Sequence, residues 1–298
     1  MDVRKSTLIY LRDLGQPVIT GYDLSKFIFK LFHKGKLQKQ PVKTKAHSKF
    51  PFQNIDRIIN EIIDIGILAL HRDFPTRRVF QIIASKNYDV GDIACSIDPF
   101  CYVSHLSAMS FHGLTDRISN ILFISSPAPN EWKQHALKKM KSDLKFYFND
   151  YINSELPSLV RIGFSKIGKY PLVRYSTTHY GAYKLIEGRK QRVSTIGRTF
   201  LDMLREPGYC GGIRHVVDVY KEFAAGYNNL ILDEIDRHGN LIEKTRAGYI
   251  LEDICGIKDN KINKWAKIIQ RGGSRKLDPS GPYSATYSER WALSINLD

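Results

Sequence analysis

The sequence lacks the long apolar segments that mark membrane and secreted proteins. No stretch approaches the roughly 18 uninterrupted apolar residues that a membrane span needs. The start, "MDVRKSTLIYLRDLG", has no continuous apolar core of the kind found in signal peptides. We therefore expect a cytoplasmic protein with no membrane partner.

Cysteine is scarce, and the common cofactor motifs are missing. The four cysteines, Cys95, Cys101, Cys210 and Cys255, show no C-x-x-C spacing, which argues against a zinc site and a disulfide framework. The glycine-rich "GYCGGI" lacks the G-x-x-x-x-G-K-[ST] form of a phosphate-binding loop, and no serine here sits in a G-x-S-x-G elbow. The sequence predicts no metal site, no cofactor and no catalytic triad.

Acidic residues are few relative to basic ones. The chain has 45 Lys and Arg against 30 Asp and Glu, a formal net charge of +15. Residues 1–90 hold 16 of the basic and 8 of the acidic residues, and eight lysines with no acidic residue lie between Lys26 and Lys49. Such an excess favours an anionic partner, and nucleic acid is the first candidate.

The apolar pattern of residues 1–88 predicts three short helices followed by a β-hairpin. The stripes that predict the helices are Val3, Leu8, Leu11 and Leu14; Leu24, Phe27, Ile28 and Leu31; and Ile55, Ile58, Ile59 and Ile62. Thr20 with Asp23 resembles a capping box, and Gly66 lies where a helix ends. "ILALHRD" and "RVFQII", joined by "FPTR", have hairpin composition. Together these elements predict a winged helix-turn-helix.

In a winged helix the third helix enters the major groove and the hairpin lies over the phosphate backbone. Gln53, Asn54 and Arg57, at the start of the third helix, are therefore the predicted base-reading residues. The predicted phosphate contacts are Lys43, Lys45, Lys49, Arg72, Arg77 and Arg78. A winged helix used for protein contact is the open alternative.

Residues 89–298 have the composition of a mixed α/β domain, strand-rich in the first half and helical in the second. "NILFISS", "LKFYF", "VRIGFSKIG" and "PLVRYST" have strand composition, and two to four helices are expected from about residue 195. The predicted fold class is α+β, with a winged helix-turn-helix at 1–88 and a second domain at 89–298.

The segment "YVSHLSAMSFHGLTDR", residues 102 to 117, concentrates histidines and hydroxyls. His105 and His112 are seven residues apart, too far to share a metal as histidines at i and i+4 do. Ser104 is a candidate N-cap and Gly113 a candidate helix end. We expect packed or capping histidines rather than a catalytic pair.

This segment, the strand "NILFISSP", "VSTIGRTFLDML" and the following "CGGI" resemble the AbiEi-type antitoxins of type IV abortive-infection toxin–antitoxin systems. "GSRKLDPS" and "YSERWALSIN" resemble the C-terminal signature of that family, so the resemblance covers most of the chain. Its motifs fall on His112 and Thr115 ("HGLT") and on Arg198 and Asp202 ("RTFLD").

The resemblance implies a bacterial or archaeal antitoxin without catalysis of its own. It implies that the N-terminal domain represses its own operon by binding inverted repeats in double-stranded DNA, as a homodimer. The second domain would neutralise a nucleotidyltransferase toxin, or act on the RNA target of that toxin. Arg198 and Asp202, at i and i+4, can pair, and Gly197 stands where a more helix-prone residue is expected.

Two further hypotheses concern anions and metals. Arg271, Arg275 and Lys276 around the glycine turn of "QRGGSRK" could hold a phosphate or RNA. Glu131 with Lys133, and Asp143 with Lys145, match the acid-x-Lys part of restriction-nuclease sites, with Asp116 as an upstream acid. A magnesium-dependent nuclease or an RNA-binding protein is therefore the alternative function.

Overall fold

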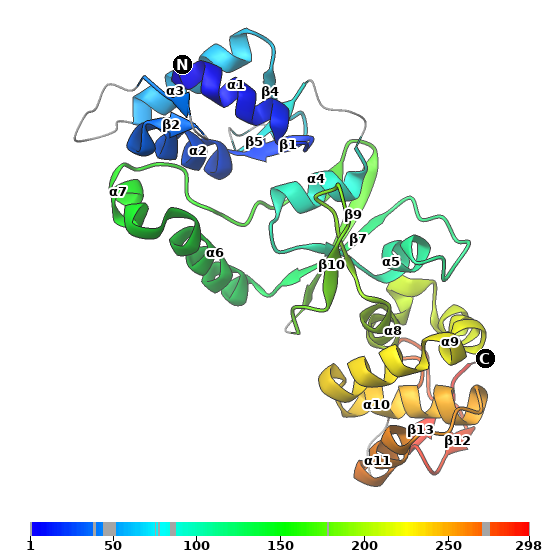
Figure 1. Ribbon diagram of the computed structural model, residues 1–298. Coiled ribbons are helices and arrows are strands. Elements are labelled where there is room, and N and C mark those ends of the chain that lie inside the picture. The colour runs from blue at the N-terminus through cyan, green and yellow to red at the C-terminus, as the bar shows by residue number, and fades with distance from the viewer. Residues whose placement is uncertain are drawn as a thin grey trace.

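The computed structural model describes residues 2–37, 40–43, 52–74, 76, 78–83, 88–177, 179–269 and 275–297, without the side chains of residues 52 and 53. Three parts follow one another along an elongated molecule (Figure 1). Helices α1 to α3 form one end, a mixed β-sheet occupies the middle, and helices α8 to α11 form the other end.

Three helices form the first part, as the apolar stripes predict: α1 (Val3–Asp13), α2 (Gly21–Lys34) and α3 (Phe52–Asp64). The Thr20 hydroxyl accepts a hydrogen bond from the Asp23 amide at the start of α2, which confirms the predicted cap. Gly66, just after α3, has a φ of +75°, a left-handed conformation that favours glycine. These signals fix where each helix begins and ends.

A three-stranded antiparallel sheet completes this part. The predicted hairpin is confirmed as β4 (Leu68–Leu70) paired with β5 (Val79–Ile82). On the other side β5 pairs with β1 (Val18–Thr20), a strand that the sequence pattern did not predict. A separate two-stranded ribbon, β2 (Lys36–Leu37) with β3 (Gln40–Pro41), follows α2. The order is therefore helix, strand, helix, helix and hairpin, with the small ribbon inserted before α3.

A helical arm from the second region packs against α2. It comprises α6 (Pro129–Leu144), the 3-10 turn η1 (Lys145–Tyr147) and α7 (Phe148–Asn153), which run below α2 in Figure 1. Their buried side chains share one hydrophobic core with α1 to α3. The expected strand "LKFYF" is wrong, because Leu144, Phe148 and Tyr151 follow a helical spacing. The first core thus extends beyond the predicted boundary at residue 88.

The middle of the molecule is a six-stranded mixed sheet in the order β10-β11-β6-β7-β9-β8. The strands are β6 (Tyr102–Val103), β7 (Leu122–Pro127), β8 (Lys166–Ile167), β9 (Tyr170–Thr177), β10 (Tyr183–Leu185) and β11 (Arg192–Ser194). The long parallel pair β7 and β9 confirms two of the expected strands, whereas "VRIGFSKIG" contributes only the short β8. Helices α4 (Val90–Ile97) and α5 (His105–Phe111) pack on this sheet through small side chains such as Ala94 and Ala108.

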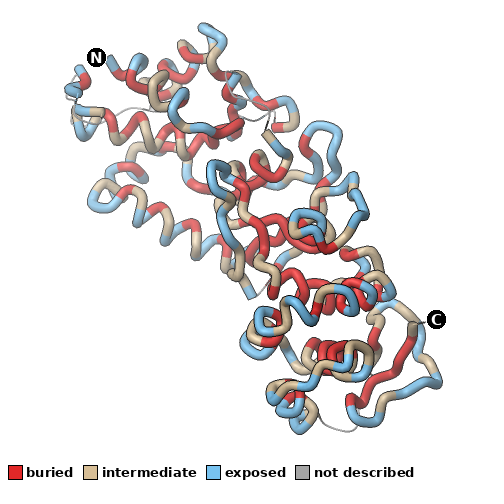
Figure 2. Tube along the Cα trace, turned by 45° about the vertical axis from the view of Figure 1, so that its right-hand side comes forward, coloured by how far each residue is buried: buried red, intermediate tan, exposed pale blue. Residues whose placement is uncertain are grey.

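Helices dominate the last third, as expected from residue 195 onward. They are α8 (Ile196–Arg205), η2 (Pro207–Cys210), α9 (Ile213–His238), α10 (Leu241–Gly248), the π-helical turn η3 (Tyr249–Ile254) and α11 (Asn260–Ile268). A two-stranded ribbon, β12 (Tyr287–Ser288) with β13 (Leu293–Ser294), closes the chain. Figure 2 shows buried residues along the inner sides of these helices.

The elements agree with the mixed α and β class expected from the sequence. Among the described residues, no helix is both long and apolar enough to cross a membrane.

Candidate nucleic-acid interface

Helix α3 buries one face and exposes the other. Ile55, Ile58, Ile59 and Ile62 are all at most 5% exposed, whereas Arg57 and Asn60 on the opposite face are exposed and Asn54 is half-buried. The side chain of Gln53, a predicted base reader, lies outside the described residues. Arg57 and Asn54 are therefore available to an external partner. Asn60 lies three residues after Arg57 on the same exposed face, so the helical spacing could have predicted its exposure as well.

Among the described residues, the ion-pair partner of Arg57 is Glu61, and the pair is weak. The Arg57 Nε lies 4.0 Å from a Glu61 carboxylate oxygen, one turn along the same helix. Both side chains are largely exposed, at 71% and 41%, and exposed pairs of this kind contribute little stability. The Arg57 guanidinium can therefore leave Glu61 at small cost.

The predicted phosphate contacts occupy three places around α3. Lys43 is exposed in the connector that precedes α3, and Arg72 is exposed in the turn between β4 and β5. Arg78 is exposed immediately before β5, and its side chain lines a cavity beside α2. Lys45, Lys49 and Arg77 lie outside the described residues.

Basic groups also gather where α2 meets the arm formed by α6, η1 and α7. Burial lowers the pKa of Lys30, and like charges on neighbouring lysines lower it further; these are Lys26, Lys34 and Lys145. Lys34 and Lys145 are exposed. This group could not be predicted from the sequence, because Lys145 is more than a hundred residues away from Lys30 in the chain. The positive surface of the N-terminal unit thus includes a residue of the second region.

Aromatic packing and a buried charge cluster hold the arm in place. The Phe29 ring of α2 lies edge-on to Tyr147 and Tyr151, with ring centroids 6.5 and 5.1 Å apart. Lys26 Nζ lies 3.0 Å from Asp143 and 2.7 Å from Asp23. Burial opposes ionisation of Asp143, but its hydrogen bond to Lys26 and the lysine charges hold its pKa below the usual value. Asp143 is therefore a structural carboxylate.

The nuclease hypothesis receives no support from the geometry of its residues. Asp143 accepts hydrogen bonds from Lys26 and Tyr22, and Leu144 beside it is buried. In the other triplet Trp132 is buried and donates to Asp98, while Lys133 points to solvent. Within the described ranges, no three His, Cys, Asp or Glu side chains come close enough to hold a metal ion.

The histidines of the segment at 102–117 are engaged in packing. His105 is fully buried, its Nδ1 lies 2.8 Å from the Ser104 hydroxyl, and Ser125 donates to that same hydroxyl. Burial lowers the pKa of His105 to about 3, so the ring stays neutral. Ser104 occupies the N-cap position, but its hydroxyl makes no capping bond to α5. The packed role expected for these histidines is confirmed for His105.

The "HGLT" motif anchors a loop. His112 Nε2 lies 2.7 Å from the Ser194 carbonyl oxygen, and Thr115 Oγ1 lies 2.9 Å from His215 Nε2. Gly113 has a φ of +68° and ends α5, as the sequence predicts. His112 and Thr115 therefore tie the segment that follows α5 to β11 and α9.

Arg198 and Asp202 do not form the expected ion pair. Arg198 instead pairs with Glu234 of α9, with Nε and Oε1 2.6 Å apart. Asp202 lies 3.6 Å from Arg205, and its second oxygen has no hydrogen-bond partner in the structure. Burial raises the pKa of Asp202 to about 7. Glu234 approaches from another helix, a contact that spacing within α8 could not reveal.

Gly197 stands in a helix where a more helix-prone residue was expected, and its presence has a steric explanation. A Cβ at this position would lie 2.4 Å from the carbonyl oxygen of Leu230 in α9. Only glycine therefore allows α8 and α9 to approach so closely.

Lys276 and Trp291 of the C-terminal motifs make contacts within the protein. The Lys276 ammonium donates to the Gly281 carbonyl oxygen at 2.6 Å and lies over the Tyr283 ring, so this predicted anion contact is engaged internally. Arg275 is half-buried, and Arg271 lies outside the described residues. Trp291 is fully buried against Gly248, where a Cβ would lie 2.0 Å from the ring.

Comparison with protein families finds no family model that matches this chain, and a search of curated proteins finds no match either. Among solved structures, the crystal structure of the RV2827C protein from Mycobacterium tuberculosis is similar. The TM-score is 0.49 and the sequence identity is 12%, over 96% of this chain and 88% of the other.

Proposed function

We propose that this protein is a DNA-binding repressor of its own operon and an antitoxin of the AbiEi type. Its N-terminal unit is a winged helix-turn-helix that binds inverted repeats, as a homodimer, through α3. Its second region neutralises a nucleotidyltransferase toxin in the cytoplasm, without catalysis of its own.

One observation carries the DNA-binding part. Helix α3 follows two helices, precedes a β-hairpin, and exposes Arg57 on the face opposite its buried isoleucines. Arginine binds the O6 and N7 atoms of guanine with two hydrogen bonds, and asparagine such as Asn54 does the same with adenine. The exposed Lys43 and Arg72 supply cations for the phosphates on either side.

The direct experiment is a gel-shift titration of the full chain with the DNA immediately upstream of its own gene. Scrambled DNA of the same length is the competitor, at two salt concentrations. We expect preferential binding that survives the higher salt, because base contacts do not depend on counterion release. Equal binding to both DNAs that disappears with salt would contradict the proposal.

The antitoxin part rests on the sequence motifs and on an exposed apolar group beside them. Phe111, Ile118 and Ile121 follow one another around the "HGLT" segment and are 45%, 91% and 37% exposed. Single exposed apolar residues are common on protein surfaces, but Ile118 is more exposed than any other large apolar residue that the structure describes. We assign the toxin to this surface.

Co-expression with the toxin tests this assignment. Ile118→Asp should reduce protection from the toxin and leave operator binding unchanged. Leu185→Asp, at a 62% exposed residue of β10, is the matched control and should protect fully. Full protection by the Ile118 variant would mean that the toxin does not bind this surface.

A further inference from the structure

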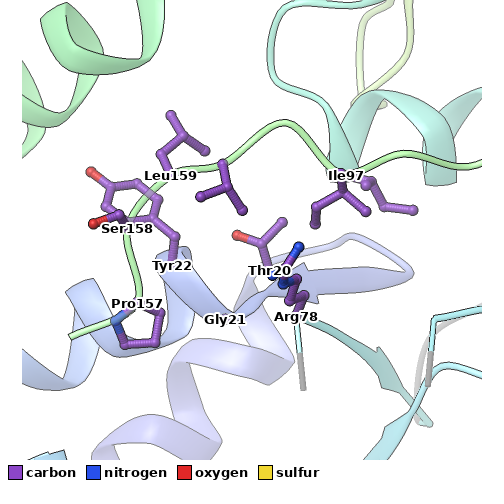
Figure 3. A pocket seen from close by; sticks show the side chains of 10 residues that line it. Thr20, Gly21, Tyr22, Arg78, Ile97, Pro157, Ser158 and Leu159 are labelled. Atoms are coloured by element: carbon purple, nitrogen blue, oxygen red, sulfur yellow. The ribbon is translucent and has the colours of Figure 1, made fainter. Parts of the chain in front are cut away.

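A cavity of about 230 Å³ lies where the N-terminal unit meets the segment that follows α7 (Figure 3). Thr20, Tyr22 and Arg78 line it from the N-terminal unit, and Ile97, Leu159 and Ile162 line it from the second region. In Figure 3 Thr20 and Arg78 lie next to each other, with Leu159 on one side of them in the view and Ile97 on the other. The cavity therefore joins the proposed DNA-binding unit to the rest of the chain.

The lining combines apolar side chains with one cation. Ile97, Leu159 and Ile162 are buried side chains, at most 8% exposed. Arg78 is exposed, and no hydrogen bond or ion pair of its guanidinium is found within the described part of the chain. A ligand with an apolar body and an anionic group would match both kinds of group.

The other polar groups of the lining carry no charge, and two of them already donate hydrogen bonds within the protein. The Thr20 hydroxyl donates to the Asp23 carboxylate, and the Tyr22 hydroxyl donates to Asp143. These two carboxylates lie outside the lining, and two cations offset their charge: Lys26 pairs with both, and Lys139 pairs with Asp143. Ser158 adds an exposed hydroxyl. No uncompensated acidic group of the described lining would therefore repel an anion.

We propose that this cavity binds a small amphipathic monocarboxylate, with its carboxylate on Arg78 and its apolar body against Ile97 and Leu159. The size is suitable, because an engineered apolar cavity of about 150 Å³ already binds benzene. A charge-assisted hydrogen bond between guanidinium and carboxylate supplies the selectivity for an acid over a neutral molecule of the same shape.

Benzoate and its neutral counterpart benzyl alcohol are the probes. Titration calorimetry with the full chain, without DNA, should show benzoate binding and at least about tenfold weaker binding of benzyl alcohol. Arg78→Gln should weaken benzoate binding by about tenfold or more, and Arg72→Gln, at an exposed arginine outside the cavity, should leave it unchanged. Val160→Trp, which fills the cavity from an exposed position of its lining, should abolish it.

Each alternative outcome overturns the inference. Equal affinity for benzoate and benzyl alcohol would mean that no cation selects the ligand. Equal effects of Arg72→Gln and Arg78→Gln would mean that the anion binds elsewhere on the basic surface. Unchanged binding in the Val160→Trp protein would place the ligand outside the cavity, and no benzoate binding at millimolar concentration would remove the site.

A regulatory consequence rests on the proposed function. A carboxylate on Arg78 neutralises a cation that the DNA phosphates would also use, so benzoate should weaken operator binding by the wild-type protein and not by Arg78→Gln. Benzoate binding is measured without DNA, so the two proposals fail independently. A protein that binds benzoate but no operator contradicts only the proposed function, and a protein that binds operator but no benzoate contradicts only the cavity proposal. If benzoate binds the cavity but changes operator affinity equally in both proteins, the coupling through Arg78 is wrong.

Discussion

Lys26 of α2 and Asp143 of α6 form an ion pair, 3.0 Å long, between residues 117 positions apart in the sequence. The Phe29 ring of α2 also packs against Tyr151 of α7, so the ion pair and the aromatic contact both hold the helical arm against α2. The helices of the N-terminal unit therefore share their hydrophobic core with a helical arm of the second region. Cutting the chain after residue 88 would expose the face of α2 that now contacts the arm.

Replacing Asp143 by Asn should destabilise the protein by about 1–3 kcal/mol at neutral pH, because the partly buried Lys26 loses one of its two countercharges and keeps only Asp23. The folded pKa of Asp143 is below its usual value, so its contribution is present above the unfolded pKa of about 3.9 and is lost as pH falls further. The difference between variant and wild type in urea unfolding should thus shrink toward pH 3. Asp150→Asn, at an exposed residue of α7, is the control and should change stability by less than about 0.5 kcal/mol.

Asp202 should show the opposite pH dependence. Burial raises its folded pKa to about 7, so its contribution is present below the unfolded value of about 3.9 and is lost as pH rises toward 7. Asp202→Asn, which stays neutral, should gain stability relative to wild type between pH 5 and pH 8. Asp218→Asn on the exposed side of α9 should show no such trend. A pH-independent difference for Asp202→Asn would mean that its carboxylate is ionised throughout.

Gly197→Ala should destabilise the fold by roughly 1–3 kcal/mol, because the new methyl group meets the Leu230 carbonyl oxygen and forces α8 from α9. Gly226→Ala is the matched control, since a Cβ there meets no atom within 4 Å. It should be neutral or stabilising by up to about 1 kcal/mol. Thermal unfolding of the two variants measures the difference, and equal effects would contradict the steric account.

Lys30 and Lys145 should both contribute to DNA affinity in a salt-dependent way. Each substitution by Gln should reduce the slope of log affinity against log salt by about 1 if the residue contacts a phosphate. The control is Lys221→Gln, at an exposed lysine of α9, which should leave the slope unchanged. A normal slope in the Lys145 variant would mean that the helical arm lies outside the DNA footprint.

The sequence predicted those helices and strands whose caps, apolar stripes and turns are formed by residues close together in the chain. The Thr20 cap, the isoleucine stripe of α3 and the hairpin at 68–82 all appear where the residues place them. Helix α6 could also have been found, because Trp132, Ala136, Met140 and Leu144 repeat every four residues and are all buried.

Contacts between distant segments could not be predicted in this way. The segment "LKFYF", where a strand was expected, is a helical turn whose Tyr147 packs on Phe29, far away in the sequence. Arg198 pairs with Glu234 rather than Asp202 for the same reason. The cavity beside Arg78 arises where two regions meet, and neither region alone carries a signal for it.

The most direct test of the account is the affinity of Arg57→Ala for operator and scrambled DNA, compared with that of Lys43→Ala. If α3 reads bases, Arg57→Ala should cost roughly 1–3 kcal/mol on the operator and much less on scrambled DNA, whereas Lys43→Ala should weaken both about equally. An equal loss on both DNAs for Arg57→Ala would contradict base reading by α3.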